Sequence, residues 1–416
     1  MIDLFRSDNV VVRCVPAEDV SRWVVTFDNY GIGHGFDRAG FGEDFLRNSG
    51  VSAIHVLGRG DDWYQYPEMA EVMAAVRGAT VGADRVMTYG SSMGGYAAIR
   101  FADAAGAHAV LAISPQYSID PAKVPFETRW LQEACRIAWL PEIDGPIRCA
   151  CTPVVVFDPT GDDRRHAEMI AAETAVEPLD LLHSGHPSAT YLSELGLLGP
   201  LVLKMLSGTL NLAEFRAEAR GRRRHCPAYL SRLAGLQPAR RAGLALALAR
   251  GANDLAPDNP SALAAVASLL IKSGDHEQAL AYHDVLSRVT GRAPNYLVLQ
   301  AQALVDAGRL DEARVLAREV VGPECDAANL WAWLAHIEWQ CGATGAAISA
   351  VERAVGLFPS YPAYQLQLDH YRACLPVAKE ALPKRRLARV FRAAKRRLGL
   401  TAAEDQADVG PTGEAT

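Results

Sequence analysis

The stretch RVMTYGSSMGGYAAIRFADAA, residues 85–105, decides the fold that we expect for the first half of the chain. Its opening residues, Arg85–Tyr89, are largely apolar, β-branched or aromatic and predict a strand, and the alanine-rich run from Met93 to Ala105 predicts a helix. Between them, Gly90-Ser91-Ser92-Met93-Gly94 fits the pattern G-x-S-x-G. A turn this tight needs glycine on both sides, because larger side chains would collide with neighbouring backbone, and it raises the hydroxyl of Ser92 above the sheet.

The flanking sequence extends this unit into a longer series. Short apolar runs alternate with helical patterns up to about residue 207, which predicts a mostly parallel sheet with helices on both faces. The other predicted strands are Val10–Val15, Trp23–Phe27, Val51–Leu57, Ala109–Ser114, Pro153–Phe157 and Leu179–Leu182, and the other predicted helices are Pro67–Arg77, His166–Ala175 and Tyr191–Ser207.

On this motif and this alternation, residues 1–208 resemble the α/β-hydrolase family. The resemblance implies that Ser92 is a nucleophile, that an acid and then a histidine follow it in the chain, and that an ester, thioester or amide reacts through an acyl-enzyme without metal or cofactor. The substrate would be a small-molecule, glycan or peptide acyl compound. Two alternatives stay open, an acyltransferase with the same triad and a non-catalytic scaffold.

The candidate base is His186, in the stretch LHSGHP at 182–187. It follows the last predicted strand and precedes the last long helix, which is where the family places its histidine. His183 is the competitor, but it lies closer to the strand, where we expect its ring to be held in packing.

The acid is expected just after the strand Pro153–Phe157, in the stretch DPTGDDRRH at 158–166. Asp162 and Asp163 are equal candidates, since they lie one loop beyond the strand, and Asp158 is the third, since it could serve only the turn. The acid would hold the imidazole tautomer and stabilise its charged form. We expect His166 at the surface or at the start of a helix rather than as the base.

Backbone amides are expected to receive the oxyanion. The amide of Met93 lies at a predicted helix N-terminus, where the potential is positive, and a second amide is expected from Asn29 or Tyr30, after the strand Trp23–Phe27. Trp63 and Tyr64 follow another strand and are candidates for substrate contact, because loops at the carboxyl ends of strands line such sites. Packing within the loop is the equal alternative for both rings.

Length, charge and cysteine content restrict the class of protein to which the chain can belong. The chain has 416 residues, 22% of them charged, with a formal net charge of −6, which suits two or three globular domains and gives no reason to expect nucleic acid. We expect no secretory leader, no membrane-spanning segment and no metal site, since Cys149 and Cys151 are too close together for ordinary zinc spacing. The eight scattered cysteines predict reduced thiols and a cytoplasmic protein.

After residue 208 the sequence becomes rich in alanine and leucine with helical periodicity. Small residues recur there at a period of 34: Gly274, Gly308 and Gly342, then Ala267, Ala301 and Ala335, then Ala279, Ala313 and Ala347. The pattern resembles tetratricopeptide repeats over 260–376, with a linker or a degenerate repeat at 209–259. Such repeats imply a docked protein partner.

The last part of the chain carries a different pattern. Residues 377–400 predict a basic amphipathic helix, in which Lys and Arg flank an apolar stripe that includes Leu387, Phe391 and Leu398. We expect this helix to cap the last repeat, and the alternatives are weak contact with an anionic membrane surface and an acidic partner. Residues 401–416 are small and polar and predict a disordered tail.

Overall fold

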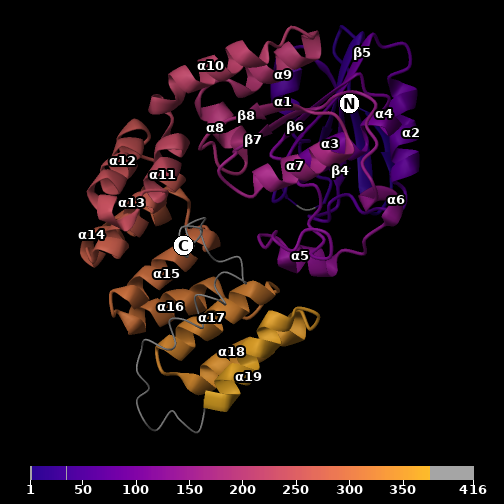
Figure 1. The fold of residues 1–416 in the computed structure, drawn as a ribbon. Helices are drawn as coiled ribbons and strands as arrows, with labels where there is room; N and C mark the ends of the chain where they lie inside the picture. Colours follow the sequence, from indigo (N-terminus) through magenta and orange to yellow (C-terminus); the bar gives the residue numbers. More distant parts are fainter. Residues whose placement is uncertain (1, 34, 375–416) are drawn as a thin grey trace, which may run out of the picture. The chain divides into compact units, whose positions relative to one another are not determined.

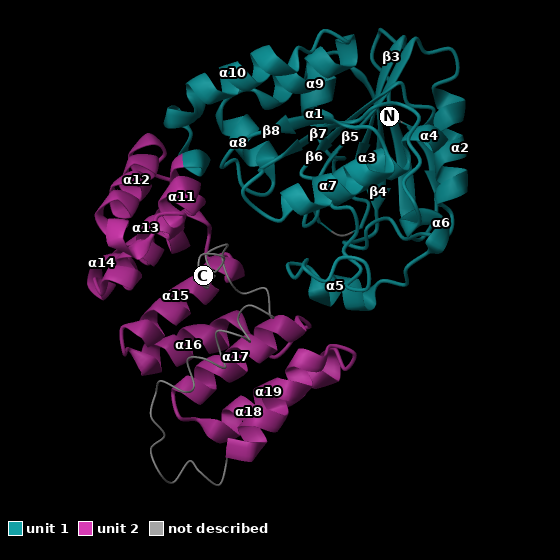
Figure 2. Ribbon diagram, viewed as in Figure 1, with its two compact units in different colours: residues 1–229 teal, residues 230–416 magenta. Residues whose placement is uncertain are grey.

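The structure is a computed structural model, and it describes residues 2–33 and 35–374 (Figure 1). The chain divides into two compact units, Met1–Tyr229 and Leu230–Thr416 (Figure 2). The basic helix predicted over 377–400 and the tail predicted over 401–416 lie outside the described residues.

The first unit is built on one eight-stranded mixed sheet. Its strands are β1 (Ile2–Arg6), β2 (Val10–Val15), β3 (Arg22–Phe27), β4 (Ser52–Gly58), β5 (Arg85–Ser91), β6 (Ala109–Ile113), β7 (Val154–Phe157) and β8 (Glu177–Asp180). They lie in the order β1-β2-β4-β3-β5-β6-β7-β8. β2 is antiparallel to both of its neighbours, and all pairs from β4 to β8 are parallel. All seven predicted strands are present, with ends displaced by two residues at most.

Burial explains why the central strands read as continuous apolar runs. β4 and β6 are buried along their whole length, and β5 is buried everywhere except Arg85. Because successive side chains of a strand point to opposite faces, helices must cover both faces of the sheet there. β1, at the edge, has no fully buried residue. The motif Gly90–Gly94 therefore begins at a strand in the buried centre of the sheet.

The helices of the first unit follow the strands in the expected alternation, with some differences. They are α1 (Glu43–Asn48), α2 (Met69–Ala79), α3 (Met93–Arg100), α4 (Ala102–Ala105), α5 (Leu131–Arg136), α6 (Pro141–Asp144), α7 (Asp163–Glu173), α8 (Ser188–Glu194), α9 (Leu198–Ser207) and α10 (Leu212–Arg222). The helix predicted over Tyr191–Ser207 is two helices, α8 and α9, bent by 102° at a break that contains Gly196 with a φ of 67°. A left-handed residue ends an α-helix, which explains the break.

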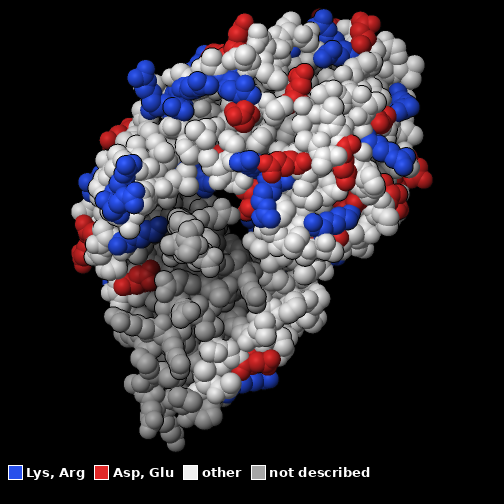
Figure 3. Space-filling model, in the orientation of Figure 1, with Lys and Arg blue, Asp and Glu red and all other residues white. Residues whose placement is uncertain are grey.

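Residues 209–229, the first part of the segment predicted as a linker or degenerate repeat, belong instead to the first unit. Helix α10 belongs to the first unit, where Phe215 and Ala219 are buried and the hydroxyl of Tyr191 donates to the carbonyl of Ala219 over 3.2 Å. Arg216 forms an ion pair of 2.7 Å with Asp180 of β8. The exposed face of α10 carries a gathering of Arg side chains, whereas both signs of charge are interspersed over the rest of the visible face of this unit (Figure 3).

Every regular element within residues 230–374 is helical. Helix α11 (Pro227–Gly235) begins in the first unit, and the others are α12 (Ala242–Leu255), α13 (Pro260–Ser273), α14 (His276–Val289), α15 (Pro294–Asp306), α16 (Leu310–Val320), α17 (Ala328–Gln340), α18 (Thr344–Leu357) and α19 (Pro362–Cys374). The three glycines at the 34-residue period have φ values between 75° and 83° and lie at the ends of α13, α15 and α17. The six registered alanines have no exposed surface.

The conformation and burial of these residues explain why glycine and alanine recur every 34 residues. Glycine adopts the left-handed conformation that ends the first helix of each pair, and alanine lets the paired helices approach closely. The prediction of helical pairs repeated every 34 residues is confirmed. No single helix among the described residues is long and apolar enough to cross a bilayer, although the bent pair of α8 and α9 would pass on length and composition alone.

Candidate active site

Ser92 lies in a strained turn between β5 and α3. Its φ of 54° and ψ of −116° fall outside the regions that L-residues favour. A Cβ on Gly90 would lie 2.2 Å from the carbonyl oxygen of Gly94, and a Cβ on Gly94 would lie 2.4 Å from the carbonyl oxygen of Phe27. Both glycines of the motif are therefore required by close backbone approach, as the sequence predicts. The amide of Ser92 is anchored to the carbonyl of Ile113 in β6 at 2.8 Å.

A continuous hydrogen-bond chain runs from this serine through two further predicted residues. The Oγ atom of Ser92 lies 3.0 Å from Nε2 of His186, and Nδ1 of His186 lies 2.8 and 2.9 Å from the two carboxylate oxygens of Asp163. An ionised carboxylate only accepts, so the proton of a neutral His186 is on Nδ1. Nε2 is then free to accept the proton of the Ser92 hydroxyl, which is the arrangement of a nucleophile and its base.

Asp163 is ionised although it is buried. Burial alone would raise its pKa, but the positive charges and hydrogen bonds of His186 and Arg129 outweigh that effect, together with a hydrogen bond from Ser114. The pKa of Asp163 is thereby lowered to about 2. The carboxylate is the first residue of α7, where the helix N-terminus also favours negative charge.

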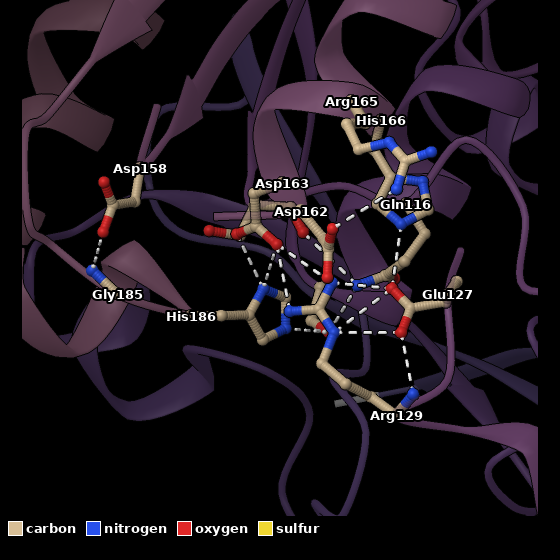
Figure 4. Close-up of polar contacts among 12 residues, drawn as sticks. Gln116, Glu127, Arg129, Asp158, Asp162, Asp163, Arg165, His166, Gly185 and His186 are labelled. Carbon is tan, nitrogen blue, oxygen red and sulfur yellow. Dashed lines mark hydrogen bonds and ion pairs between the residues drawn. The ribbon is translucent and has the colours of Figure 1, made fainter. Parts of the chain in front are cut away.

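The other candidates for the acid and the base lie elsewhere. Asp162 precedes α7 and lies 3.7 Å from Arg165. Asp158 accepts a hydrogen bond of 2.9 Å from the amide of Gly185 (Figure 4) and one of 3.1 Å from the amide of His183, and so holds the loop that carries His186. The ring of His183 packs 6.1 Å from that of Tyr229.

His166 was expected at the surface or at the start of a helix, and it lies in the first turn of α7 but is buried. It lies in α7 with no exposed surface, and its Nε2 is 2.9 Å from a carboxylate oxygen of Glu127. Its Nδ1 accepts a hydrogen bond of 3.2 Å from the amide of Tyr117. A buried polar ring needs hydrogen-bond partners, and Glu127 and the amide of Tyr117 provide one for each nitrogen of His166.

The predicted oxyanion donors lie on two adjacent segments. Met93 is the first residue of α3, so its amide is one of the first four that have no partner within the helix. The clash that a Cβ on Gly94 would have with Phe27 shows that the start of α3 touches the end of β3. Asn29 and Tyr30 follow directly, and the side chain of Asn29 donates to the carbonyl of Tyr30 over 2.8 Å.

A cluster of aromatic side chains lies beside His186. Trp63, Trp130 and Tyr30 pack on one another with ring centroids 5.5 to 6.2 Å apart, and the ring of Trp130 lies 5.3 Å from that of His186. Trp63 is fully buried and Tyr30 is partly exposed. Tyr64 is also buried, and its hydroxyl donates to Val56 and accepts from the amide of Asp28. Trp63 and Tyr64, the two rings predicted for substrate contact or for packing, are thus buried in packing, whereas Tyr30, predicted for its backbone amide, retains exposed surface.

Gln116 is a residue of the site that the sequence analysis did not single out. Its Oε1 accepts a hydrogen bond of 3.2 Å from the indole Nε1 of Trp63, which can only donate. This fixes the orientation of the amide, so that Nε2 faces Ser92 and donates to its Oγ over 3.0 Å. Gln116 comes three residues after β6, at the edge of the sheet where β5 also ends. That placement is the signal that could have identified it.

Arg129 and Glu127 are two further residues that were missed. Arg129 donates to Asp163 over 3.0 and 3.1 Å and to both oxygens of Glu127. Both lie between β6 and α5, in a stretch without regular structure. Nothing in the local sequence marks such a partner. Among the described residues, no group of three or more His, Cys, Asp or Glu could hold a metal ion.

Comparisons with known proteins leave the family open. No family model matches the chain. No curated protein matches it either. Among solved structures, the chain is similar to MamA 41-end from Desulfovibrio magneticus RS-1 (18% identity, 41% of this chain and 94% of that chain, TM-score 0.30). It is also similar to YrrB, a TPR protein with an unusual peptide-binding site (14% identity, 44% and 90%, TM-score 0.31), and to the capsule O-acetyltransferase of Neisseria meningitidis serogroup A (13% identity, 47% and 93%, TM-score 0.32).

Proposed function

We propose that the first unit is a serine hydrolase that acts on esters or related acyl bonds through an acyl-enzyme. One observation carries the proposal, the unbroken chain of hydrogen bonds from Ser92 through His186 to the ionised Asp163. The strained turn at Ser92 and the chain order of serine, acid and histidine add support, since both belong to the α/β-hydrolase resemblance.

The geometry suggests the role of each group. Ser92 attacks the carbonyl carbon while its proton passes to Nε2 of His186, and Asp163 stabilises the imidazolium. The oxyanion is received by the amide of Met93 and by a second amide at Asn29 or Tyr30. His186 then protonates the leaving alcohol. In the second half it takes a proton from the water that attacks the acyl carbon, and it returns this proton to Oγ of Ser92 as the bond between the acyl carbon and Oγ breaks and the carboxylic acid leaves.

Gln116 has a role at both stages. Its Nε2 donates to Oγ of Ser92, the atom that gains negative charge as its proton leaves and again when the acyl-enzyme breaks down. A neutral donor aimed at that atom stabilises the charge without removing the proton that His186 must take.

Labelling with a fluorophosphonate probe tests the proposal. The probe forms a bond between phosphorus and the attacking oxygen and releases fluoride, so it reports an activated serine without a known substrate. We expect labelling of the wild-type chain and none of Ser92→Ala. The matched control is Ser91→Ala, because the buried Ser91 hydroxyl has no hydrogen-bond partner among the described residues and should be dispensable. A wild-type chain that takes no label, or a Ser92→Ala variant that labels normally, would contradict the proposal.

For the second unit we propose docking of a protein partner. Paired helices repeated at a fixed period form an extended surface, which such arrays use for binding. We further propose a cytoplasmic location, because all eight cysteines are free thiols and a reducing compartment preserves that state. Co-purification with the second unit, compared with a chain that ends at residue 229, tests the docking role.

A further inference from the structure

The triad acid belongs to a larger buried network of charges. Asp163, Arg129, Glu127 and His166 are joined in that order by hydrogen bonds of 2.7 to 3.1 Å (Figure 4). Asp163 and Glu127 are almost fully buried, and His166 has no exposed surface. Such a network has to be satisfied internally, because each member would otherwise leave a buried charge without a partner.

The protonation states of the network follow from its hydrogen bonds. The amide of Tyr117 donates to Nδ1 of His166, so the ring proton of a neutral His166 lies on Nε2 and is donated to Glu127. Glu127 is ionised, because the hydrogen bonds from His166 and Arg129 and the positive charge of Arg129 outweigh the burial of its carboxyl group and lower its pKa to about 2. With Asp163 and Arg129 also charged, the network carries two negative charges and one positive charge.

We propose that Arg129 and Glu127 are positioning residues that set the proton affinity of His186 by acting through Asp163. Arg129 binds the carboxylate oxygen Oδ1 that is also 2.9 Å from Nδ1 of His186. Its positive charge therefore weakens the attraction between Asp163 and the imidazolium. Glu127 binds the same guanidinium and partly cancels that effect. The inference rests on the proposed function, since it concerns the base of the same triad.

Other groups around His186 do not provide the same control. From the side of α7 it faces Asp163, and from the β6–α5 stretch it faces Trp130, with Arg129 stacked on that ring at 4.4 Å. Ser92 lies on its Nε2 side. Asp158 binds the backbone of its loop, and Asp162 lies near Arg165. Arg129 and Glu127 are thus the charged groups that reach the ring through its hydrogen-bonded acid.

Replacing Arg129 and replacing Glu127 should shift the pH at which His186 becomes a free base in opposite directions. Removing the charge of Arg129 leaves two carboxylates near the imidazolium, which stabilises it and raises the pH at which His186 becomes a free base. Removing the charge of Glu127 leaves one carboxylate opposed by a full positive charge, which lowers that pH. Charges at this separation in a partly buried site shift a titration by about one pH unit or more.

The experiment measures the rate of fluorophosphonate labelling of the full-length chain across pH, which gives the midpoint at which the base loses its proton. For Arg129→Met we expect a midpoint about one pH unit above wild type, and for Glu127→Gln a midpoint about one pH unit below it. The double variant retains one net negative charge, as the wild-type network does, and should return close to the wild-type midpoint. Thermal unfolding of each variant shows that it is folded at the assay temperature.

The outcomes separate a positioning role from a structural one. If both residues only support the fold, the rates fall while the midpoint stays at the wild-type value, and the inference is overturned. A shift of both single variants in the same direction overturns it as well. Glu127→Gln is isosteric, so its downward shift can be measured even if Arg129→Met does not fold. Absence of Ser92-dependent labelling in the wild-type chain would instead overturn the proposed function, and this inference with it.

Discussion

His183 and His186 lie three residues apart in one loop, and their atoms serve different purposes. The ring of His186 reaches Ser92 and Asp163, whereas the backbone amide of His183 binds Asp158 and its ring packs against Tyr229. We therefore expect His186→Ala to lower the fluorophosphonate labelling rate by about a thousandfold or more, because members of a triad act as a unit. His183→Ala, the matched control, keeps its backbone amide and should label within about tenfold of wild type. Equal losses would leave the base unassigned, and the reverse order would assign it to His183.

Gln116 makes a second prediction at the scale of single residues. Gln116→Leu removes the donor to Ser92 and leaves the buried indole N–H of Trp63 without its partner. A lost hydrogen bond of this kind corresponds to about a tenfold lower labelling rate. Trp63→Phe is the control, since it removes the partner of the Gln116 oxygen but keeps the donor to Ser92, and it should cost less. A Gln116→Leu chain that labels as fast as wild type would show that the amide only fills space.

At the scale of elements, the turn between β5 and α3 depends on backbone approach. A methyl group at Gly90 would overlap the backbone of Gly94 at 2.2 Å, and the strand and helix on either side are too well packed to move. We expect Gly90→Ala to lower the free energy of unfolding of the first unit by about 3 kcal/mol and to abolish labelling. Gly78→Ala is the control, because Gly78 lies in α2 with open space around it and the change should stabilise the helix by about 0.5–1 kcal/mol. Similar behaviour of the two variants in urea unfolding would contradict the argument.

The network between α7 and the β6–α5 stretch makes stability depend on pH. The folded pKa values of Asp163 and Glu127 are both about 2, below the values near 4 that unfolded carboxyls have. A lowered folded pKa contributes stability above the unfolded pKa, and that stability is lost as pH falls through the folded pKa. The free energy of unfolding should therefore decrease between about pH 4.5 and pH 2, by on the order of 2 kcal/mol for each carboxyl if they act independently.

Urea unfolding at several pH values checks this prediction, with Glu127→Gln as the comparison. The variant has one titrating carboxyl fewer, so its loss of stability across this range should be smaller. Burial lowers the pKa of His55 to about 4. As the pH falls, the stability that His55 contributes is therefore lost mainly between about pH 6.5 and pH 4, before the two carboxyl groups titrate. Identical slopes for wild type and variant below pH 4.5 would show that Glu127 does not titrate as described.

The sequence predicts the position of a site residue well when that residue lies next to a regular element. Ser92, His186 and Asp163 all follow strands, and strands have a clear apolar pattern, so their meeting at one edge of the sheet could be anticipated. The choice between Asp162 and Asp163 could not be made, because neighbouring residues at a helix start point in directions that depend on the exact position of the helix. Arg129 lies in a stretch without periodicity, and its contact with Asp163 depends on tertiary packing alone.

The boundary between the two units lies further along the chain than the change in composition suggests. The sequence changes character at about residue 208, because α10 is rich in charge and alanine like the helices that follow it. The buried face of α10 is nevertheless part of the first unit, where Phe215 is almost fully buried and the hydroxyl of Tyr191 donates to the carbonyl of Ala219 over 3.2 Å. Composition reflects the exposed face of such a helix, whereas the unit to which it belongs is decided by its few buried residues.

Two truncations test this division. A chain that ends at residue 229 keeps α10 and should be soluble, fold cooperatively and label at Ser92 at a rate within about twofold of the full-length chain, since the whole triad lies within the first unit. A chain that ends at residue 208 exposes the surface that Phe215 covers, and burying one such side chain contributes about 1.5–3 kcal/mol. We therefore expect the shorter chain to unfold at a lower temperature and to aggregate more.

Phe215→Ala in the longer chain is the matched control and should reproduce part of that loss while α10 stays in place. If the two truncations unfold at the same temperature, α10 does not stabilise the first unit, and if neither labels while the full-length chain does, the helical repeats are needed to complete the active site.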